Sequence, residues 1–388
     1  MRLMQRCRPR FPRGCVRLLV ASVAVTLSAC GGGSGSTTPG DKTCQQDPTQ
    51  AKCIVNNPPT TTLRGLASAR GRMFGVSVDA TFFGVNPAAY DTVVAREFSL
   101  IVAGNVMKWS SIHRDSRYSY RWTNPDAMVP FALANGMQVR GHTLVWYQQN
   151  PAWLTNTAWN PETLKVVLKE HIDSVVGHYK GKILAWDVVN EAFNDGTGSL
   201  RVTGSPWAST LGAGYIDLAF QEARAADPAA LLFYNDYNLE TPGLKQDSVY
   251  GRLSNMKARG IPIDGIGFQA HFQVNADATG VPSKETLIAT FNRFAALGLK
   301  IHITELDIRV RTPGATAAEL AAQNQGFANV TSACLAVPAC EAMVVWGLND
   351  GESWVPGTFP GYGQALLFDD SYGRKATYNA VSAALQTP

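Results

Sequence analysis

Short apolar runs alternate with amphipathic stretches over most of the chain, starting near residue 74. The runs are rich in β-branched and aromatic residues, which is typical of strands buried on both faces. The stretches between them space their apolar residues three or four positions apart, which predicts helices. Eight strands are expected, over residues 74–78, 99–103, 138–143, 183–189, 231–235, 265–271, 300–305 and 343–346.

Polar and aromatic residues gather at the ends of these runs. Eight strands with crossover helices predict an α/β fold, a (β/α)8 TIM barrel forming a single catalytic domain, with the active site at the carboxyl ends of its strands. Polar residues without a special role would be scattered over both ends of a barrel, so their concentration at one end predicts a site. The residues at these ends are Lys108, His142, Asn190, Glu191, Asn235, His271, Glu305 and Trp346.

The N-terminus combines an arginine-rich stretch with an apolar run over residues 18–27. This run is too short to span a bilayer, so it predicts a signal peptide and export. The next residues, LSAC over 27–30, resemble a bacterial lipobox, although four common residues can also match by chance. We therefore expect residues 1–29 to be a lipoprotein-type signal peptide. Cys30 would then carry lipid and anchor the protein at the cell surface or in the periplasm, on the outer membrane.

Residues 30–62 are rich in Gly, Ser, Thr and Pro and contain few apolar residues. We expect them to form a flexible tether before a catalytic domain over residues 63–386. The chain has 34 basic and 30 acidic residues, but six arginines lie within residues 1–17. The remainder is close to neutral, so nothing indicates a nucleic-acid partner. We expect a monomer that meets the membrane through its lipid only.

Four cysteines remain when the signal peptide and Cys30 are set aside, and an even number suits an oxidising compartment. The simplest connectivity pairs Cys334 with Cys340 and Cys44 with Cys53. Metal ligation is the weaker alternative, because neither pair has CxxC spacing or an adjacent histidine.

Two of the expected strands end in carboxylates that contribute nothing to a buried strand. Residues 186–191 end in an amide and a carboxylate, Asn190 and Glu191, and residues 303–307 end in Glu305 and Asp307. Two strand-end glutamates are what retaining glycoside hydrolysis requires, one as nucleophile and one as acid/base.

Five ordered motifs carry a family resemblance: RGHTLVW (140–146), DVVNE (187–191), NDYN (235–238), GFQAH (267–271) and TELD (304–307). The set resembles glycoside hydrolase family 10, the family of endo-β-1,4-xylanases, from about residue 63 to 385. A single motif would be weak, whereas the ordered set is specific. The resemblance implies a TIM-barrel enzyme that acts on xylan or a related β-1,4-linked polysaccharide without a metal or organic cofactor.

The resemblance also implies a role for each matching residue. Glu305 would be the nucleophile and Glu191 the acid/base, with Asn190, His271 and Asp307 in support. The implied substrate-binding residues are Asn105, Lys108, His142, Trp146, Gln149, Asn235, Tyr237, Gln269, Trp346 and Trp354.

The main departure from the family pattern is Gly104, where the family usually has a glutamate that binds the second sugar on the glycone side. Loss of a charged hydrogen-bond acceptor costs about 1.5 to 3 kcal/mol, or roughly one to two decades in affinity. We therefore expect a weakened glycone subsite. Milder departures are Tyr147, where histidine is common, and Ser110, where an acidic residue usually follows the tryptophan.

Three alternatives to a xylanase stay open. The first is a related β-1,4-glycanase for glucose-based or decorated chains, and the second is a non-catalytic polysaccharide-binding lipoprotein. The third is a metal hydrolase built from His142, His271 and Asp307.

Other aromatic and histidine residues lack motif support. We expect Trp122 and Trp207 in the core, and His113, His171 and His178 in solvated or capping positions. Strict alternation along the strand predicts that His302 points toward the helix layer.

Overall fold

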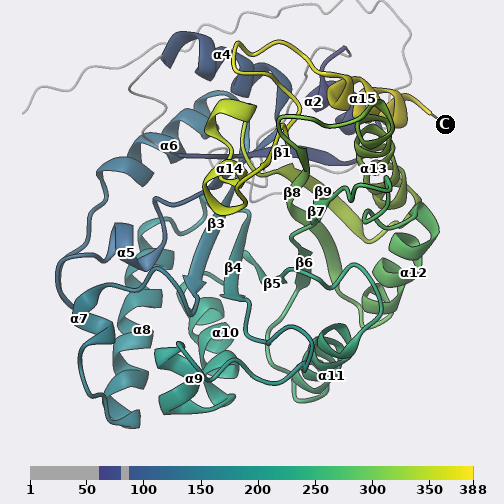
Figure 1. Cartoon of the computed structure of the whole chain (residues 1–388). Coiled ribbons are helices and arrows are strands. Elements are labelled where there is room, and N and C mark those ends of the chain that lie inside the picture. Colours follow the sequence, from purple (N-terminus) through teal and green to yellow (C-terminus); the bar gives the residue numbers. More distant parts are fainter. Residues whose placement is uncertain (1–60, 80–86, 388) are drawn as a thin grey trace, which may run out of the picture. The chain divides into compact units, whose positions relative to one another are not determined.

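The computed structural model describes residues 61–79 and 87–387. The expected signal peptide, Cys30, Cys44, Cys53 and nearly all of the expected tether lie outside the described residues. Eight parallel strands form a closed ring in the order β1-β2-β3-β4-β5-β6-β8-β9, and β9 pairs with both β8 and β1. The predicted (β/α)8 TIM barrel is thereby confirmed (Figure 1). The ring strands are β1 (Met73–Val78), β2 (Leu100–Ala103), β3 (Gln138–Val145), β4 (Ala185–Asn190), β5 (Leu231–Asp236), β6 (Gly265–Phe268), β8 (Lys300–Arg311) and β9 (Cys340–Val345).

Helices lie outside the ring of strands (Figure 1). In α8, buried residues recur three or four positions apart, including Leu164, Val167, Leu168 and Ile172, so one face packs inward. The helices are α2 (Leu63–Ala69), α4 (Pro87–Glu97), α5 (Trp109–Ile112), α6 (Thr123–Ala134), α7 (Ala152–Thr155), α8 (Pro161–His178), α9 (Pro206–Leu211), α10 (Gly214–Ala226), α11 (Leu244–Ala258), α12 (Lys284–Ala295), α13 (Ala317–Ala336), α14 (Val355–Thr358) and α15 (Ala376–Gln386), with a 3-10 turn, η2 (Asp350–Glu352).

The sixth expected strand, 265–271, is interrupted in the structure. It ends at Phe268, and a separate short strand, β7 (His271–Gln273), pairs with the outer part of β8. Between them Ala270 has a φ of +58°, and its N–H donates to a carboxylate oxygen of Glu240 at 2.7 Å. The chain turns here because a buried side chain, and not a neighbouring strand, accepts this backbone hydrogen bond. A further short strand, β10 (Tyr362–Gly363), pairs antiparallel with the end of β8.

The interior of the barrel contains a buried ion pair. Arg140 on β3 donates from Nε to Asp187 Oδ2 on β4 at 3.0 Å and from Nη2 to Oδ1, and both side chains are 1% exposed. Arg140 Nη1 also donates to His302 Nδ1 on β8 at 2.8 Å, and the His302 ring lies against Phe233 of β5. Side chains from β3, β4, β5 and β8 can meet only inside the ring.

The predicted direction of His302 is therefore wrong. Its pairing with β9 is irregular between Ile303 and Leu306, so strict alternation does not hold along this strand. Burial lowers the pKa of His302 to about 4, so its ring is neutral and accepts the hydrogen bond from Arg140.

One glycine is required by close packing inside β3. A Cβ atom on Gly141 would lie 2.1 Å from the indole of Trp186 on the neighbouring strand. Only glycine at position 141 leaves room for Trp186, the largest side chain of β4.

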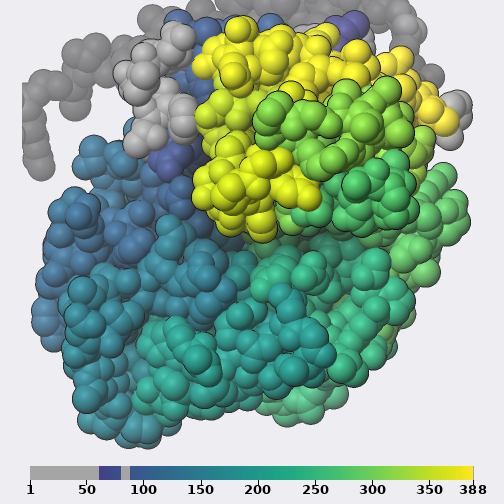
Figure 2. Space-filling view, viewed as in Figure 1, coloured from purple at the N-terminus to yellow at the C-terminus, as the bar shows by residue number. Residues whose placement is uncertain are grey.

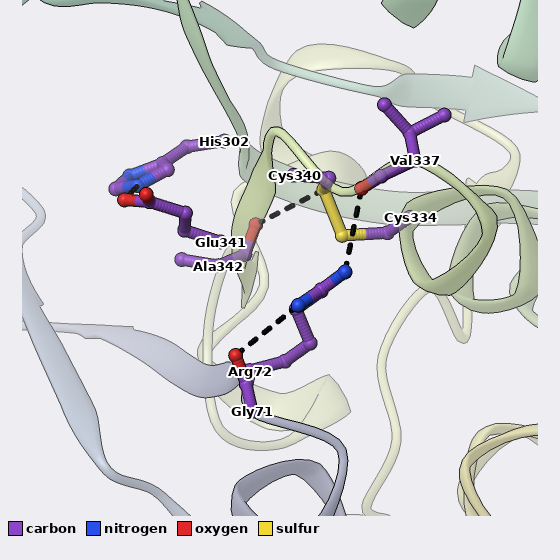
Figure 3. Close-up of a disulfide and its surroundings, with 8 residues drawn as sticks. All are labelled: Gly71, Arg72, His302, Cys334, Val337, Cys340, Glu341 and Ala342. Carbon is purple, nitrogen blue, oxygen red and sulfur yellow. Dashed lines mark hydrogen bonds and ion pairs between the residues drawn. A yellow bond between two sulfur atoms is a disulfide. The ribbon is translucent and has the colours of Figure 1, made fainter. Parts of the chain in front are cut away.

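The predicted disulfide between Cys334 and Cys340 is confirmed (Figure 3). It joins the end of α13 to the first residue of β9, and Arg72 reaches the Val337 carbonyl of the intervening turn at 3.4 Å.

Within residues 61–79 and 87–387, no helix is both long enough and apolar enough to cross a membrane.

Trp207 is fully buried, as expected for the core, whereas Trp122 is partly exposed and stacks on His178. The expectation of solvated or capping positions is wrong for His171, which is fully buried inside α8. His113 is the C-cap residue of α5, a capping position as expected, although it is also fully buried. The Nδ1 atoms of the two rings are 3.1 Å apart.

Candidate active site

A cleft of about 680 Å³ opens at the carboxyl ends of the barrel strands. Figure 2 shows this face hollowed between the yellow C-terminal segment and the teal and green loops. Its size is that of sites that enclose small organic ligands or sugar units. The predicted site residues that line it are Asn105, Lys108, His142, Trp146, Gln149, Asn190, Glu191, Tyr237, Gln269, His271, Glu305, Trp346 and Trp354.

Glu305 on β8 is held by two donors, one from β5 and one from β7. Asn235 Nδ2 donates to its Oε1 at 2.7 Å, and His271 Nε2 lies 3.1 Å from its Oε2. Asp307 Oδ2 lies 2.9 Å from His271 Nδ1 and accepts the indole N–H of Trp354 at 2.7 Å. Asn235 and Asp307 are fully buried and lie outside the cleft lining, so they support residues that face it.

These contacts fix the charge states of His271 and Glu305. Burial by itself would lower the pKa of His271, but the charge and hydrogen bond of Asp307, followed by those of Glu305, raise it to about 10. The imidazole is therefore protonated near neutral pH. Burial by itself would raise the pKa of Glu305, but the hydrogen bond from His271 is the main effect that holds it below its ordinary value. Glu305 is thus an ionised carboxylate, as a nucleophile must be.

Glu191 follows β4 and is fixed from several sides. Its Oε2 accepts the indole N–H of Trp146 at 2.9 Å, and its Oε1 accepts from Gln269 at 2.9 Å and from Asn190 at 3.2 Å. Its backbone carbonyl accepts from Arg201 Nε at 3.1 Å. The carboxyl group is therefore held at the surface of the cleft.

Amide side chains connect the two carboxyl groups. Asn235 Nδ2 donates to Glu305 Oε1 and also to Asn190 Oδ1, at 2.9 Å. Gln269 Nε2 donates to Asn190 Oδ1 at 3.2 Å and to Glu191 Oε1. One hydrogen-bond network thus orients both carboxyl groups toward the same cleft.

The β2 and β3 side of the cleft is polar with an aromatic surface. Lys108 Nζ donates to Asn105 Oδ1 at 3.1 Å and lies 4.9 Å from the ring centre of Trp146. Burial lowers the pKa of Lys108 to about 8, although the negative charges of Glu305 and Glu191 act to raise it. This side therefore offers hydrogen-bond donors beside an aromatic ring, which suits sugar hydroxyls.

On the β9 side of the cleft, two histidines each meet the ring of a tryptophan. His142 Nδ1 donates to Asp187 Oδ2 at 3.0 Å, which leaves Nε2 for a ligand. The Trp346 ring meets the His142 ring edge-on, with centroids 5.3 Å apart. Trp354 meets the ring of His271 in the same way, at 5.0 Å.

The β4 and β5 side contains a residue that the sequence did not predict, Arg201. Its Nη2 donates to the Tyr237 hydroxyl at 3.1 Å, and its guanidinium lies 4.3 Å from the ring centre of Tyr147. Lys245 lies 3.4 Å from the ring centre of Tyr237 and pairs with Asp236 at 2.7 Å. Arg201 lies in a polar loop away from any strand end, so its contacts with the site are not predictable from the ends of the strands.

Four residues in the cleft lining or directly beside it have the left-handed backbone conformation although none is glycine. The φ angles are +47° for Gln149, +55° for Glu191, +56° for Asn238 and +58° for Ala270. Each lies in the segment that follows a barrel strand, so the backbone bends where side chains must turn toward the cleft.

Within the described part of the chain, no group of three or more His, Cys, Asp or Glu side chains is placed to hold a metal ion. The residues considered for such a site have other partners. His142 contacts Asp187, and His271 lies between Asp307 and Glu305.

Comparison with known proteins gives one family. Residues 62–384 match the profile of glycosyl hydrolase family 10. The chain is 41% identical over 325 residues to endo-1,4-beta-xylanase B of Thermotoga neapolitana, which covers 84% of this chain and 91% of that protein. It is 40% identical over 327 residues to endo-1,4-beta-xylanase 5 of Pyricularia oryzae, with 83% and 78% covered. The crystal structure of xylanase 10B from Thermotoga petrophila in complex with xylobiose is similar, with a TM-score of 0.81, 40% identity, and 85% of this chain and 99% of that chain covered.

Proposed function

Because the chain belongs to glycosyl hydrolase family 10, we propose that it is a retaining endo-β-1,4-xylanase that hydrolyses internal bonds of xylan by double displacement. The observation that carries this proposal is the pair of carboxyl groups, Glu305 and Glu191, which face one cleft and share one network of amide side chains. The named relatives above are endo-1,4-beta-xylanases, and one similar structure contains xylobiose.

In the first step, a carboxylate oxygen of Glu305 attacks the anomeric carbon of the sugar. The bond from that carbon to the glycosidic oxygen breaks, and Glu191 gives its proton to the departing oxygen. The product is a glycosyl ester on Glu305. The hydrogen bond from His271, together with its positive charge, keeps Glu305 ionised before attack, and Asn235 holds the carboxylate in place.

In the second step, a water molecule attacks the anomeric carbon from the side that the leaving group vacated. Glu191, now a carboxylate, takes the proton from this water. The bond between the sugar and Glu305 breaks, and Glu305 returns as a carboxylate. Two inversions at one carbon retain the configuration of the sugar.

The remaining residues of the cleft would bind the chain of sugars. Asn190 lies beside Glu191 and would hydrogen-bond the sugar 2-hydroxyl, an interaction that strengthens in the transition state. The apolar walls around the cleavage point would come from Trp346 and Trp354. Tyr237 would contact the sugar across the scissile bond with Asn235 behind it, and Gln269 would belong to the floor of the same site.

The test is the initial rate of the full chain on aryl β-xylobioside and on aryl β-cellobioside. A clear preference for the xylobioside supports the xylanase. Comparable or reversed rates would favour a glycanase for glucose-based chains, and no rate on either substrate would favour a binding protein without turnover.

We also propose export through residues 1–29, lipidation of Cys30 and attachment to the outer membrane, with the catalytic domain over residues 63–386 acting as a monomer. The support is the arginine-rich start, the apolar run and the LSAC motif in the sequence. Membrane fractionation of cells that express the wild type or Cys30→Ala tests the anchor. Equal amounts of both proteins in the membrane fraction would contradict it, and size-exclusion chromatography with light scattering tests the monomer.

A further inference from the structure

The end of the cleft near β1 and β2 contains a carboxylate that the sequence analysis did not consider. Asp79 directly follows β1, is partly buried and lines the cleft. Its Oδ2 accepts a hydrogen bond from Asn105 Nδ2 at 3.2 Å. The carboxylate thus lies beside an implied substrate-binding residue that directly follows position 104, where the family usually has its glutamate for the second sugar.

Asn105 is oriented by its other neighbours. Its Oδ1 accepts from Lys108 Nζ at 3.1 Å and from Gln149 Nε2 at 3.3 Å. With the amide oxygen facing Lys108 and Gln149, the amide nitrogen faces Asp79. The side chains form one hydrogen-bonded row. The donors Lys108 and Gln149 lie at one end, Asn105 lies in the middle, and the carboxylate of Asp79 lies at the other end.

Gly104 explains why the carboxylate reaches this place from β1. A Cβ atom on Gly104 would lie 2.9 Å from Ser77 Oγ and 3.2 Å from the carbonyl oxygen of Val78. The end of β1 therefore occupies the space into which a side chain at position 104 would extend. The missing side chain brings the segment that carries Asp79 close to the sugar-binding row.

A second carboxyl group borders the same end of the cleft. Glu352 lines the cleft, and its Oε1 accepts from the N–H of Leu348. Burial, together with the charge of Asp79, raises the pKa of Glu352 to about 7. Glu352 is therefore largely uncharged below neutral pH, and Asp79 is the carboxyl group that contacts Asn105.

We propose that Asp79 is a specificity-determining residue of the proposed xylanase, accepting hydrogen bonds from hydroxyl groups of the second sugar on the glycone side. This proposal rests on the proposed function. It reverses one expectation from the sequence, because a carboxylate from β1 stands in for the glutamate that position 104 lacks, and the subsite keeps its affinity.

The experiment compares two aryl glycosides with the same leaving group, a β-xyloside that fills only the first glycone subsite and a β-xylobioside that fills both. We expect Asp79→Ala in the full chain to lower kcat/KM on the xylobioside by about ten- to a hundredfold. The loss should appear mainly in KM, because the contact is present in both the ground state and the transition state. The xyloside should be hydrolysed almost as before. Asp79→Asn, which keeps one acceptor oxygen, should lose less.

The matched control is Asp277→Asn, an exposed aspartate outside the cleft lining, which should leave both rates unchanged. Thermal unfolding of each variant separates lost binding from lost folding. The inhibition constant of xylobiose should rise in Asp79→Ala by the same factor as KM.

The outcomes distinguish the two proposals. If the wild type hydrolyses neither xylobioside nor xylan, the proposed function is wrong. If the wild type hydrolyses both and Asp79→Ala keeps the ratio of xylobioside to xyloside rates, only the role of Asp79 is overturned. Equal losses on both glycosides would likewise overturn it, because they would show a general effect on the site.

Discussion

The substitution Asp307→Asn should shift the acidic limb of the pH profile of kcat/KM without displacing Glu305, the proposed nucleophile. Asp307 contributes the largest favourable effect on protonation of His271, whose pKa is raised to about 10. In the variant, the new amide nitrogen can take the place of Oδ2 and donate to His271 Nδ1, so the ring stays as a neutral imidazole that donates from Nε2 to Glu305, while the indole N–H of Trp354 loses its acceptor. The contact between His271 and Glu305 is kept, and the positive charge next to Glu305 is lost.

The size of the effect follows from the contact distance. His271 Nε2 and Glu305 Oε2 are 3.1 Å apart, and two unit charges at that distance attract by about 5 kcal/mol at an effective dielectric constant of about 20. This is an upper limit, because the hydrogen bond remains in the variant. A neighbouring opposite charge lowers the pKa of a carboxyl group by about 1 to 3 units, or roughly 1.4 to 4 kcal/mol. The pKa of Glu305 should rise by an amount in that range.

The assay is kcat/KM against pH on an aryl β-xylobioside with a good leaving group, so that the first step is observed. Protonated Glu305 cannot attack, so the acidic limb of the profile should move to higher pH by about 1 to 3 units, with a much smaller loss on its alkaline side. Asp227→Asn, at a buried aspartate outside the cleft lining, should leave the limb in place. An unshifted acidic limb in Asp307→Asn, or a loss that is equal at every pH, would refute the charge argument.

Three further predictions concern catalysis and stability. Glu305→Ala should abolish turnover on every substrate, whereas Glu191→Ala should spare the first step on aryl glycosides with good leaving groups; equal losses in stopped-flow rates would contradict the assigned roles. Because the folded-state pKa of Glu352 is raised to about 7, its burial should destabilise the protein increasingly as pH rises from about 4.5 through 7. Glu352→Gln should therefore be more stable than the wild type at pH 8, by on the order of 3 kcal/mol, and should gain little at pH 5, as urea unfolding would measure. Burial lowers the pKa of His113 and, much further, of His171, so stability should fall as pH drops below about 6.5. His171→Phe should flatten that dependence in thermal melts at pH 7.5 and 5, and an unchanged slope would contradict it.

The barrel could be predicted from the sequence because strands buried on both faces leave uninterrupted apolar runs. The same pattern carries no information on local irregularities. The break after Phe268 depends on a hydrogen bond from Ala270 to Glu240, thirty residues away in sequence, and the direction of His302 depends on an irregular pairing within β8. Neither contact changes the hydrophobic period, so the sequence could predict the strands but not these details.

The candidate site was predictable where a polar residue directly follows a strand. Arg201 follows no strand, and it reaches Glu191 and Tyr237 only through the folded loop. Asp79 does follow a strand, and its role was missed for another reason. The family pattern has its carboxylate at position 104, whereas the carboxylate that approaches Asn105 here comes from the end of the neighbouring strand, β1.

The left-handed residues in the cleft lining or directly beside it have a consequence for directed evolution toward heat resistance. A non-glycine residue in this conformation costs on the order of 1 kcal/mol or more, so glycine at Ala270 or Asn238 would relax the backbone. A screen that rewards survival at high temperature would therefore select such changes readily. The same changes would loosen the segments that carry His271 and Tyr237. Heat-selected libraries of this protein should thus be screened for turnover in every round, since the simplest stabilising replacements lie beside residues of the proposed active site.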